Sequence, residues 1–121
     1  MQRLEYNPAA AQRYLDKSDA KFIFWVCPNE KTPDKKSPRL NARMFFYNGE
    51  DPATGSASGC AAAWMRMYDV AAENERVLIL QGVEMKRRSE IFVRAEKHGD
   101  KVTNVCVGGN AVEVGEGNFV V

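Results

Sequence analysis

The chain has 121 residues, of which 45% are hydrophobic and 27% charged, a balance typical of a globular domain. Its formal net charge of +1 excludes the strong single-sign field that recruits nucleic acid or an anionic membrane surface. No apolar run approaches the roughly 20 residues that span a bilayer, and the first residues lack the apolar stretch of a secretory signal. We therefore expect a single cytoplasmic domain over residues 1–121 that binds neither nucleic acid nor membrane.

The cysteines and the single histidine do not form a recognisable metal motif. Cys27, Cys60 and Cys106 are odd in number and widely spaced, which argues against both a disulfide framework and a zinc site. Each has apolar neighbours, so we predict buried, reduced thiols. His98 stands beside Gly99 and is expected to be a solvated turn residue rather than a catalytic base. No metal or organic cofactor is expected.

The N-terminal third predicts a helix, a strand and a loop. Asn7 followed by Pro8 is typical of a helix start, with a short helix to about residue 16. The apolar run at 21–27 predicts a strand buried on both faces, ended by Pro28. Residues 29–38 are rich in proline and lysine and are expected to form a mobile, solvated loop.

A strand and a strongly apolar helix are predicted next. From residue 39 the side chains that share one strand face are apolar, namely Leu40, Ala42, Met44 and Phe46. A turn at 48–52 follows. One helical stripe is then formed by Ala57, Cys60, Ala61, Trp64 and Tyr68. The opposite side is apolar too, so we expect a helix buried nearly all round, with Trp25 and Trp64 as core anchors.

The remainder is rich in strand patterns. Strands are predicted at 77–80, 89–95, 102–107 and 111–114, with a possible final edge at 119–121. Gly99-Asp100 favours one hairpin turn, and Gly108-Gly109-Asn110 favours a second. The expected architecture is α+β: a curved, mostly antiparallel sheet, or half-barrel, wrapped around one central buried helix.

The segment 50–59 is the candidate functional site. It joins a strand to the helix and is crowded with small residues. Gly55, Ser56 and Ala57 place free backbone N–H groups at the positive end of the helix dipole. Such a helix start favours a carboxylate or phosphate, and small side chains let the ligand approach the backbone closely. Asp51 adds a carboxylate that can accept a hydrogen bond or carry a proton.

A purely structural interpretation of the same segment stays open. Thr54 or Ser56 could serve only as an N-cap, and Asp51 could accept hydrogen bonds only within its own turn. A Walker-type phosphate loop is disfavoured, because no lysine follows the glycines. The basic run 86–88 could grip an anion, although an exposed turn is the simpler interpretation.

Asp51-Pro52-Ala53-Thr54-Gly55-Ser56-Ala57 resembles the signature of the PhzF-type isomerases of phenazine biosynthesis, which share the diaminopimelate-epimerase-like fold. Supporting motifs occur in the family's order. They are Arg43-Met44-Phe45, Gln81-Gly82, Arg87 with Ser89, and Val107-Gly108-Gly109 with Ala111-Val112. The resemblance covers about residues 40 to 115 and corresponds to the family's C-terminal half.

The resemblance implies a half-barrel around a central helix, two of which form one protein with the active site between them. Family members move a proton on a dihydro-hydroxyanthranilate without metal or organic cofactor, using a glutamate of the first half as the main proton shuttle. By this resemblance Asp51 is the candidate catalytic residue. Thr54, Gly55, Ser56 and Ala57 are the candidate substrate-binding residues.

The chain also departs from the family pattern. The half that carries the glutamate has no counterpart in this sequence, and the segment between Phe45 and Glu50 is shorter than usual. Lys86 and Arg88 replace the customary glycine and proline. Thr54 stands where the related amino-acid epimerases have a catalytic cysteine, which disfavours racemisation by two cysteines.

Three functions remain open from the sequence. The chain could supply half of a metal-free isomerase site for a small cyclic carboxylate. It could instead bind a small carboxylate without turnover, or serve as a dimerisation module. In each case we expect self-association as a homodimer or pairing with a complementary half, because an isolated half exposes the apolar flank that meets its sister.

Overall fold

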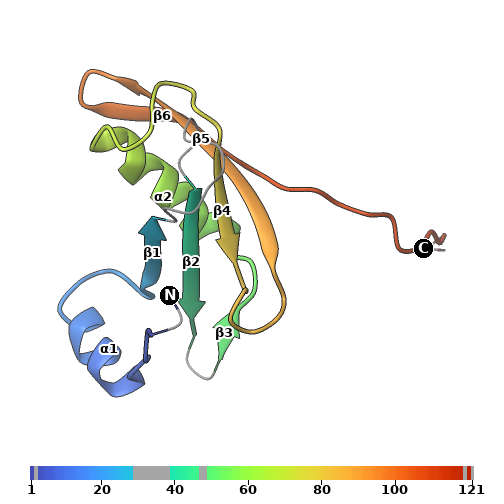
Figure 1. Cartoon of the computed structure of the whole chain (residues 1–121), viewed down its shortest axis with the longest axis horizontal. Helices are drawn as coiled ribbons and strands as arrows, with labels where there is room; N and C mark the ends of the chain where they lie inside the picture. Colours follow the sequence, from blue (N-terminus) through green and yellow to red (C-terminus); the bar gives the residue numbers. More distant parts are fainter. Residues whose placement is uncertain (2, 29–38, 47–48, 119, 121) are drawn as a thin grey trace.

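The computed structural model describes residues 1, 3–28, 39–46, 49–118 and 120. Two helices and one sheet of six strands are arranged as shown in Figure 1. In chain order they are α1 (Pro8–Leu15), β1 (Phe24–Pro28), β2 (Arg39–Phe45), β3 (Glu50–Asp51), α2 (Gly55–Met67), β4 (Val77–Gln81), β5 (Ser89–His98) and β6 (Lys101–Gly108). The predicted loop at 29–38 lies outside the described residues.

The sheet is open and mixed. Its strand order is β1-β2-β4-β5-β6, with β3 paired to β2. Among the strands that the structure describes, only β2 and β4 run parallel, while the other pairs are antiparallel. This agrees with the predicted α+β class and with a mostly antiparallel sheet. Helix α2 connects β3 to β4 and contacts β5 and β6 from one side of the sheet.

The predicted helix start at Asn7 is confirmed. The Asn7 side-chain oxygen accepts a hydrogen bond from the Ala10 N–H at 3.0 Å, and Pro8 is the first residue of α1. The prediction that the following strand is buried on both faces is wrong. Strand β1 is an edge strand whose Trp25 is 36% exposed and whose Cys27 is exposed. Among the described residues β1 pairs only with β2, so one of its edges has no neighbouring strand to cover it.

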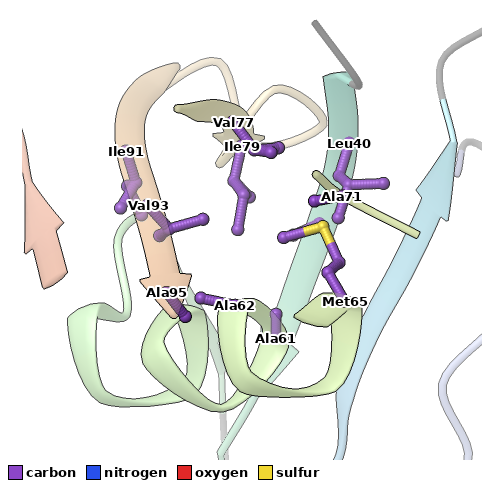
Figure 2. Close-up of a cluster of buried hydrophobic side chains, with 11 residues drawn as sticks. Leu40, Ala61, Ala62, Met65, Ala71, Val77, Ile79, Ile91, Val93 and Ala95 are labelled. Carbon is purple, nitrogen blue, oxygen red and sulfur yellow. The ribbon is translucent and has the colours of Figure 1, made fainter. Parts of the chain in front are cut away.

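The hydrophobic core lies between α2 and the sheet (Figure 2). Leu40 and Ala42 of β2 contribute to it with the predicted two-residue period, and Met44 is buried on the same strand. Met65 projects from α2 toward side chains of the sheet. The other members of the cluster are Ala61, Ala62, Ala71, Val77, Ile79, Ile91, Val93 and Ala95. Small alanines on both sides let the helix approach the sheet closely.

The prediction that α2 is buried nearly all round is wrong. Its buried face is formed by Ser58, Ala61, Ala62, Met65 and Arg66. The predicted stripe lies mostly on the opposite side, where Trp64 is 44% exposed and Cys60 and Tyr68 are exposed. Apolar periodicity marked two faces of the helix as suitable for burial, but the open sheet covers only one.

Strands β5 and β6 form the predicted hairpin at Gly99-Asp100. Their register shifts between Arg94 and Glu96, and Asn104 opposite the shift has a positive φ of 48°. Such a bulge re-aims the side chains that follow it. Val102 packs against the core, and Val105 and Val107 lie against Gly59 of α2, so β6 presents all three to the helix side.

The second predicted hairpin does not form. After Gly108 the chain has no regular structure through residue 118, and residues 109–118 are exposed. Figure 1 shows this segment leading away from the body of the molecule. The predicted strand at 111–114 is therefore wrong for this chain by itself, and the possible edge at 119–121 lies largely outside the described residues.

The cysteine prediction is corrected in part. The three thiols are free, but Cys27 and Cys60 are exposed and Cys106 is half-buried. His98 is exposed, as predicted, with Glu96 at 3.7 Å from its Nε2. Within the described ranges no group of three or more His, Cys, Asp or Glu side chains is placed to hold a metal ion. None of the described helices is long and apolar enough to cross a membrane.

Candidate active site at the start of helix α2

An arginine–glutamate pair fixes the strand that precedes the site. Arg43 of β2 donates to both carboxylate oxygens of Glu50 at 2.9 and 2.8 Å, a bidentate geometry. The same guanidinium donates to the Leu4 carbonyl at 3.1 Å and lies 4.7 Å from the Phe45 ring centroid. The hydrogen bond to Glu50 raises the pKa of Arg43 above its ordinary value. Strand β3 is thereby held against β2, directly before Asp51.

The buried amide of Gln81 holds the turn between β3 and α2. Its side-chain oxygen accepts the Thr54 N–H at 3.0 Å. Its side-chain nitrogen donates to the Asp51 carbonyl at 2.7 Å and to the Thr54 hydroxyl oxygen at 2.9 Å. Gln81 is fully buried at the end of β4. All three bonds link the end of β4 to the turn before α2. They also satisfy the Gln81 amide, which as a buried polar group needs hydrogen-bond partners.

The Asp51 carboxylate lies inside this turn. One of its oxygens, Oδ2, accepts the Thr54 hydroxyl at 2.5 Å. The other, Oδ1, accepts the Ala53 N–H at 3.4 Å, a long and therefore weak hydrogen bond. Asp51 is half-buried, and each oxygen can accept a further donor, with Oδ1 engaged only by the weaker bond.

Gly82 allows a second segment to approach the turn. It has a positive φ of 73°, and a Cβ atom there would lie 2.3 Å from the Arg87 carbonyl oxygen and 3.0 Å from Pro52. The Arg87 N–H in turn donates to the Gly82 carbonyl at 2.9 Å. Only glycine fits here, because the backbones of Pro52 and Arg87 both pass close to residue 82. The segment after β4 therefore lies against the turn before α2.

The first turn of α2 has free backbone donors. Thr54 is the N-cap, but its side chain makes no capping bond and donates to Asp51 instead. Within the described part of the chain the N–H groups of Gly55, Ser56 and Ala57 have no acceptor, as expected for the first turn of a helix. Gly55 and Ser56 are exposed and Ala57 is half-buried. The helix start therefore offers unpaired amides to solvent rather than to packed protein.

A pocket of about 560 Å³ opens beside this helix start. Its lining combines small residues with one cation: Ala53, Gly55, Arg88, Ser89, Glu90, Ile91, Val107, Gly108, Gly109 and Asn110. Arg88 forms an ion pair with Glu90 and remains more than half exposed. Gly55 at the helix start, the Ser89 hydroxyl and the exposed part of the Arg88 guanidinium lie around one hollow, a set of donors that favours an anion of small-molecule size.

The structure brings some of the predicted site residues together and separates others. Gly55 lines the pocket, and the exposed Ser56 follows it in the first turn of α2. Thr54 is buried behind them, with its N–H and hydroxyl engaged internally. Asp51 is adjacent to Thr54 but does not line the pocket.

Two residues of the candidate site are not evident as site residues from the sequence alone. Gln81 belongs to a family motif, and a glutamine ending the run Val-Leu-Ile-Leu indicates a buried polar side chain. The basic run 86–88 predicts an exposed turn, which is correct for Arg88, but the place of Arg88 beside Gly55 depends on the close approach at Gly82.

Comparison with known proteins confirms the family resemblance seen in the sequence. A family model described as phenazine biosynthesis-like protein matches residues 1–117. The trans-2,3-dihydro-3-hydroxyanthranilate isomerase of Pseudomonas chlororaphis is 43% identical over 85 residues, which are 68% of this chain and 31% of that protein. The isomerase of the same name from Pseudomonas aeruginosa is 41% identical over 79 residues, 63% of this chain and 28% of that protein.

A more distant relative is an uncharacterized isomerase of Mesorhizobium japonicum, 36% identical over 73 residues, 60% of this chain and 24% of that protein. The matched region thus spans about a third or less of each of these relatives, and they are named as isomerases. Since the family model covers nearly the whole sequence, the chain belongs to the phenazine biosynthesis-like protein family.

Proposed function

We propose that this chain provides half of an isomerase site that moves a proton on a small cyclic carboxylate, without a metal or organic cofactor. The observation that carries the proposal is the set of unpaired amides of Gly55, Ser56 and Ala57 beside a pocket containing Arg88. These donors suit a substrate carboxylate. The isomerase relatives support the reaction class, and the family resemblance supports cofactor independence and a half-barrel of the diaminopimelate-epimerase-like type.

In this proposal Asp51 orients the substrate and assists proton transfer. Its Oδ2 is tied to the Thr54 hydroxyl, which fixes the plane of the carboxylate. Its Oδ1 has only the long bond from Ala53 and can accept a substrate N–H or O–H. Thr54 positions Asp51, while Gly55, Ser56 and Ala57 bind the substrate through the helix start.

The principal proton shuttle comes from outside residues 1–121. Since the matched region is about a third of the isomerase relatives, the remaining wall of the site belongs to a complementary half or to a second copy of this chain. Self-association as a homodimer, or pairing with such a half, is therefore part of the proposal.

A non-catalytic carboxylate-binding module is the second candidate. One observation favours it: the only acid lining the pocket in the described structure is Glu90, which is already paired with Arg88. The pocket by itself is thus rich in donors for an anion and poor in proton carriers.

Calorimetric binding of cyclic amino- and hydroxy-carboxylates tests the helix-start site. Gly55→Pro is the decisive variant, because proline is accepted at the first helical position and removes one N–H. Thr54 before it is already extended, with φ −120° and ψ 93°, and a Cβ at residue 55 would touch nothing within 4 Å. We expect about tenfold weaker binding, the effect of one charge-assisted hydrogen bond, with unchanged stability. Unchanged affinity would remove the helix start from the site.

Proton–deuterium exchange separates the two candidate functions. We expect exchange into a bound carboxylate to be slowed by Asp51→Asn and unaffected by Asp100→Asn, the same change in the exposed hairpin turn. Equal slowing by both variants would exclude a specific role for Asp51. Tight binding without exchange, even with a complementary half added, would favour the binding module.

A further inference from the structure

The segment after β6 has the pattern of a strand without a sheet. Residues 109–118 are exposed and make neither helix nor strand. Within them Ala111-Val112-Glu113-Val114 alternates, and Val112 and Val114 are 82% and 94% exposed. Apolar side chains at every second position and an unpaired extended backbone are the features of a strand that completes another sheet.

Strand β6 offers an edge of suitable length. It spans eight residues and, in the described structure, pairs on one side only, with β5. Val105 and Val107 point toward α2, yet each is 43% exposed. Beside them α2 exposes Cys60 and Trp64. An open strand edge next to a half-exposed apolar row is a template for strand addition.

The two segments match in one antiparallel register. If Val112 lies opposite Val107, then Val114 lies opposite Val105, and both added valines extend the row over α2. A shift of one residue would turn them to the other face of the sheet, so the apolar pattern selects this register.

The opposite face of the sheet matches the same register in charge. Glu113 would lie opposite Cys106, whose neighbour on β5 is Arg94. Arg94 and Arg76 line one pocket of about 280 Å³ together with Cys106. Neither arginine has an ion-pair partner among the described residues, although Arg76 stacks on the Phe92 ring at 3.8 Å. A carboxylate at position 113 would bring a negative charge to this basic face.

The path of the chain points away from its own β6. At Gly109 the backbone still runs beside β5, since a Cβ there would lie 3.4 Å from the Glu90 carbonyl oxygen. The following residues lead away from the body (Figure 1).

We propose that residues 111–114 of each chain add as an antiparallel strand to β6 of a second copy. Reciprocal exchange closes a two-fold dimer and covers the open β6 edge of each copy. The inference makes the self-association proposed above specific, and it does not depend on ligand binding.

A native thiol makes the register testable. Glu113→Cys would place a thiol opposite Cys106 of the second copy, at a cross-strand distance that a disulfide can bridge. In a background with the exposed Cys27 and Cys60 both changed to serine, we expect mild oxidation to give mostly covalent dimer on a non-reducing gel, and adding Cys106→Ser to abolish it. Val112→Cys is the matched control, because its side chain faces α2 and should link to Cys106 at least tenfold less.

Three outcomes would overturn the inference. Oxidised Glu113→Cys that stays monomeric while losing two free thiols would show that the segment folds onto its own β6. Covalent dimer that survives Cys106→Ser would show a different register. A wild-type chain that sediments as a dimer while Val112→Asp leaves its dissociation constant unchanged would place the interface elsewhere; we expect at least a tenfold increase. These readouts involve no carboxylate, so they can fail while the helix-start site stands.

Discussion

Three hydrogen bonds meet at the buried amide of Gln81, so this residue controls the geometry of the turn that carries Asp51. Gln81→Met keeps the approximate shape of the side chain and leaves the buried Thr54 N–H without an acceptor. We expect the free energy of unfolding to fall by about 3 kcal/mol, measured by urea denaturation. Leu80→Met, at the adjacent buried position, is the control and should cost less than about 1.5 kcal/mol. Equal losses would show that the hydrogen bonds contribute little.

Glu96 provides a residue-scale test of the β5–β6 bulge. Its carboxylate accepts the Asn104 side-chain amide at 2.8 Å, and this bond is the main reason that the pKa of Glu96 lies below its ordinary value. A lowered folded-state pKa stabilises the fold above the ordinary pKa of glutamate, and that stabilisation is lost as pH falls through the lowered value.

The measurement is an NMR titration of the Glu96 carboxyl. Asn104→Gly removes the amide while tolerating the φ of 48°. We expect the pKa of Glu96 to return toward its ordinary value in this variant. The loss of stability with falling pH should then become shallower, because the folded and unfolded states would bind the Glu96 proton equally. A pKa that does not move would assign the shift to the weaker contribution of Asn74.

At the scale of elements, two glycines predict opposite effects of one substitution. Gly59 lies inside α2, and a Cβ there would meet Val107 and Val105 at 3.4 and 3.7 Å, which half-exposed side chains can accommodate. Gly59→Ala should therefore raise the free energy of unfolding by about 0.5–1 kcal/mol through helix propensity. Gly82→Ala should lower it by at least about 2 kcal/mol, because φ is positive and backbone atoms block the Cβ. Thermal and urea unfolding measure both. If Gly59→Ala lowered the free energy of unfolding as much as Gly82→Ala does, α2 and β6 would be packed too tightly to accept a side chain at residue 59.

At the scale of the whole molecule, the open edges and the exposed face of α2 imply a concentration-dependent stability. A dimer that covers Trp64, Val105 and Val107 gains stability by mass action as protein concentration rises. We expect the thermal midpoint to increase with concentration between micromolar and millimolar protein, and a chain ending at residue 110 to lose this dependence. A midpoint independent of concentration in the intact chain would contradict self-association.

Local sequence patterns were sufficient where a few neighbouring residues decide the structure. Asn7-Pro8 predicted the start of α1, Gly99-Asp100 the β5–β6 turn, and the alternation from Leu40 the buried face of β2. Each of these depends on capping, turn geometry or the two-residue strand period, all of which are encoded within about one turn of chain.

The candidate site was predictable in its residues but not in its arrangement. The small residues at 55–57 indicated free amides, and the structure leaves them unpaired. The bond from Thr54 to Asp51 lies within one turn, and the sequence left that possibility open. Sequence could not show that Gln81 would hold this turn or that Arg88 would line the pocket, because both depend on β4 and its following turn passing near Pro52. Such contacts join residues about 30 positions apart in the sequence, and a local sequence pattern does not predict a contact over that separation.

The sequence by itself determined the class of fold, the helix start that can hold an anion, and the family to which the chain is similar. Only the tertiary structure decided which face of α2 is buried, that Trp25 and Trp64 are partly exposed, and that residues 111–114 have no strand partner in the described part of the chain. The physical reason is that apolar periodicity states which surfaces are suitable for burial, whereas the number of strands available in the chain determines how many of those surfaces are covered.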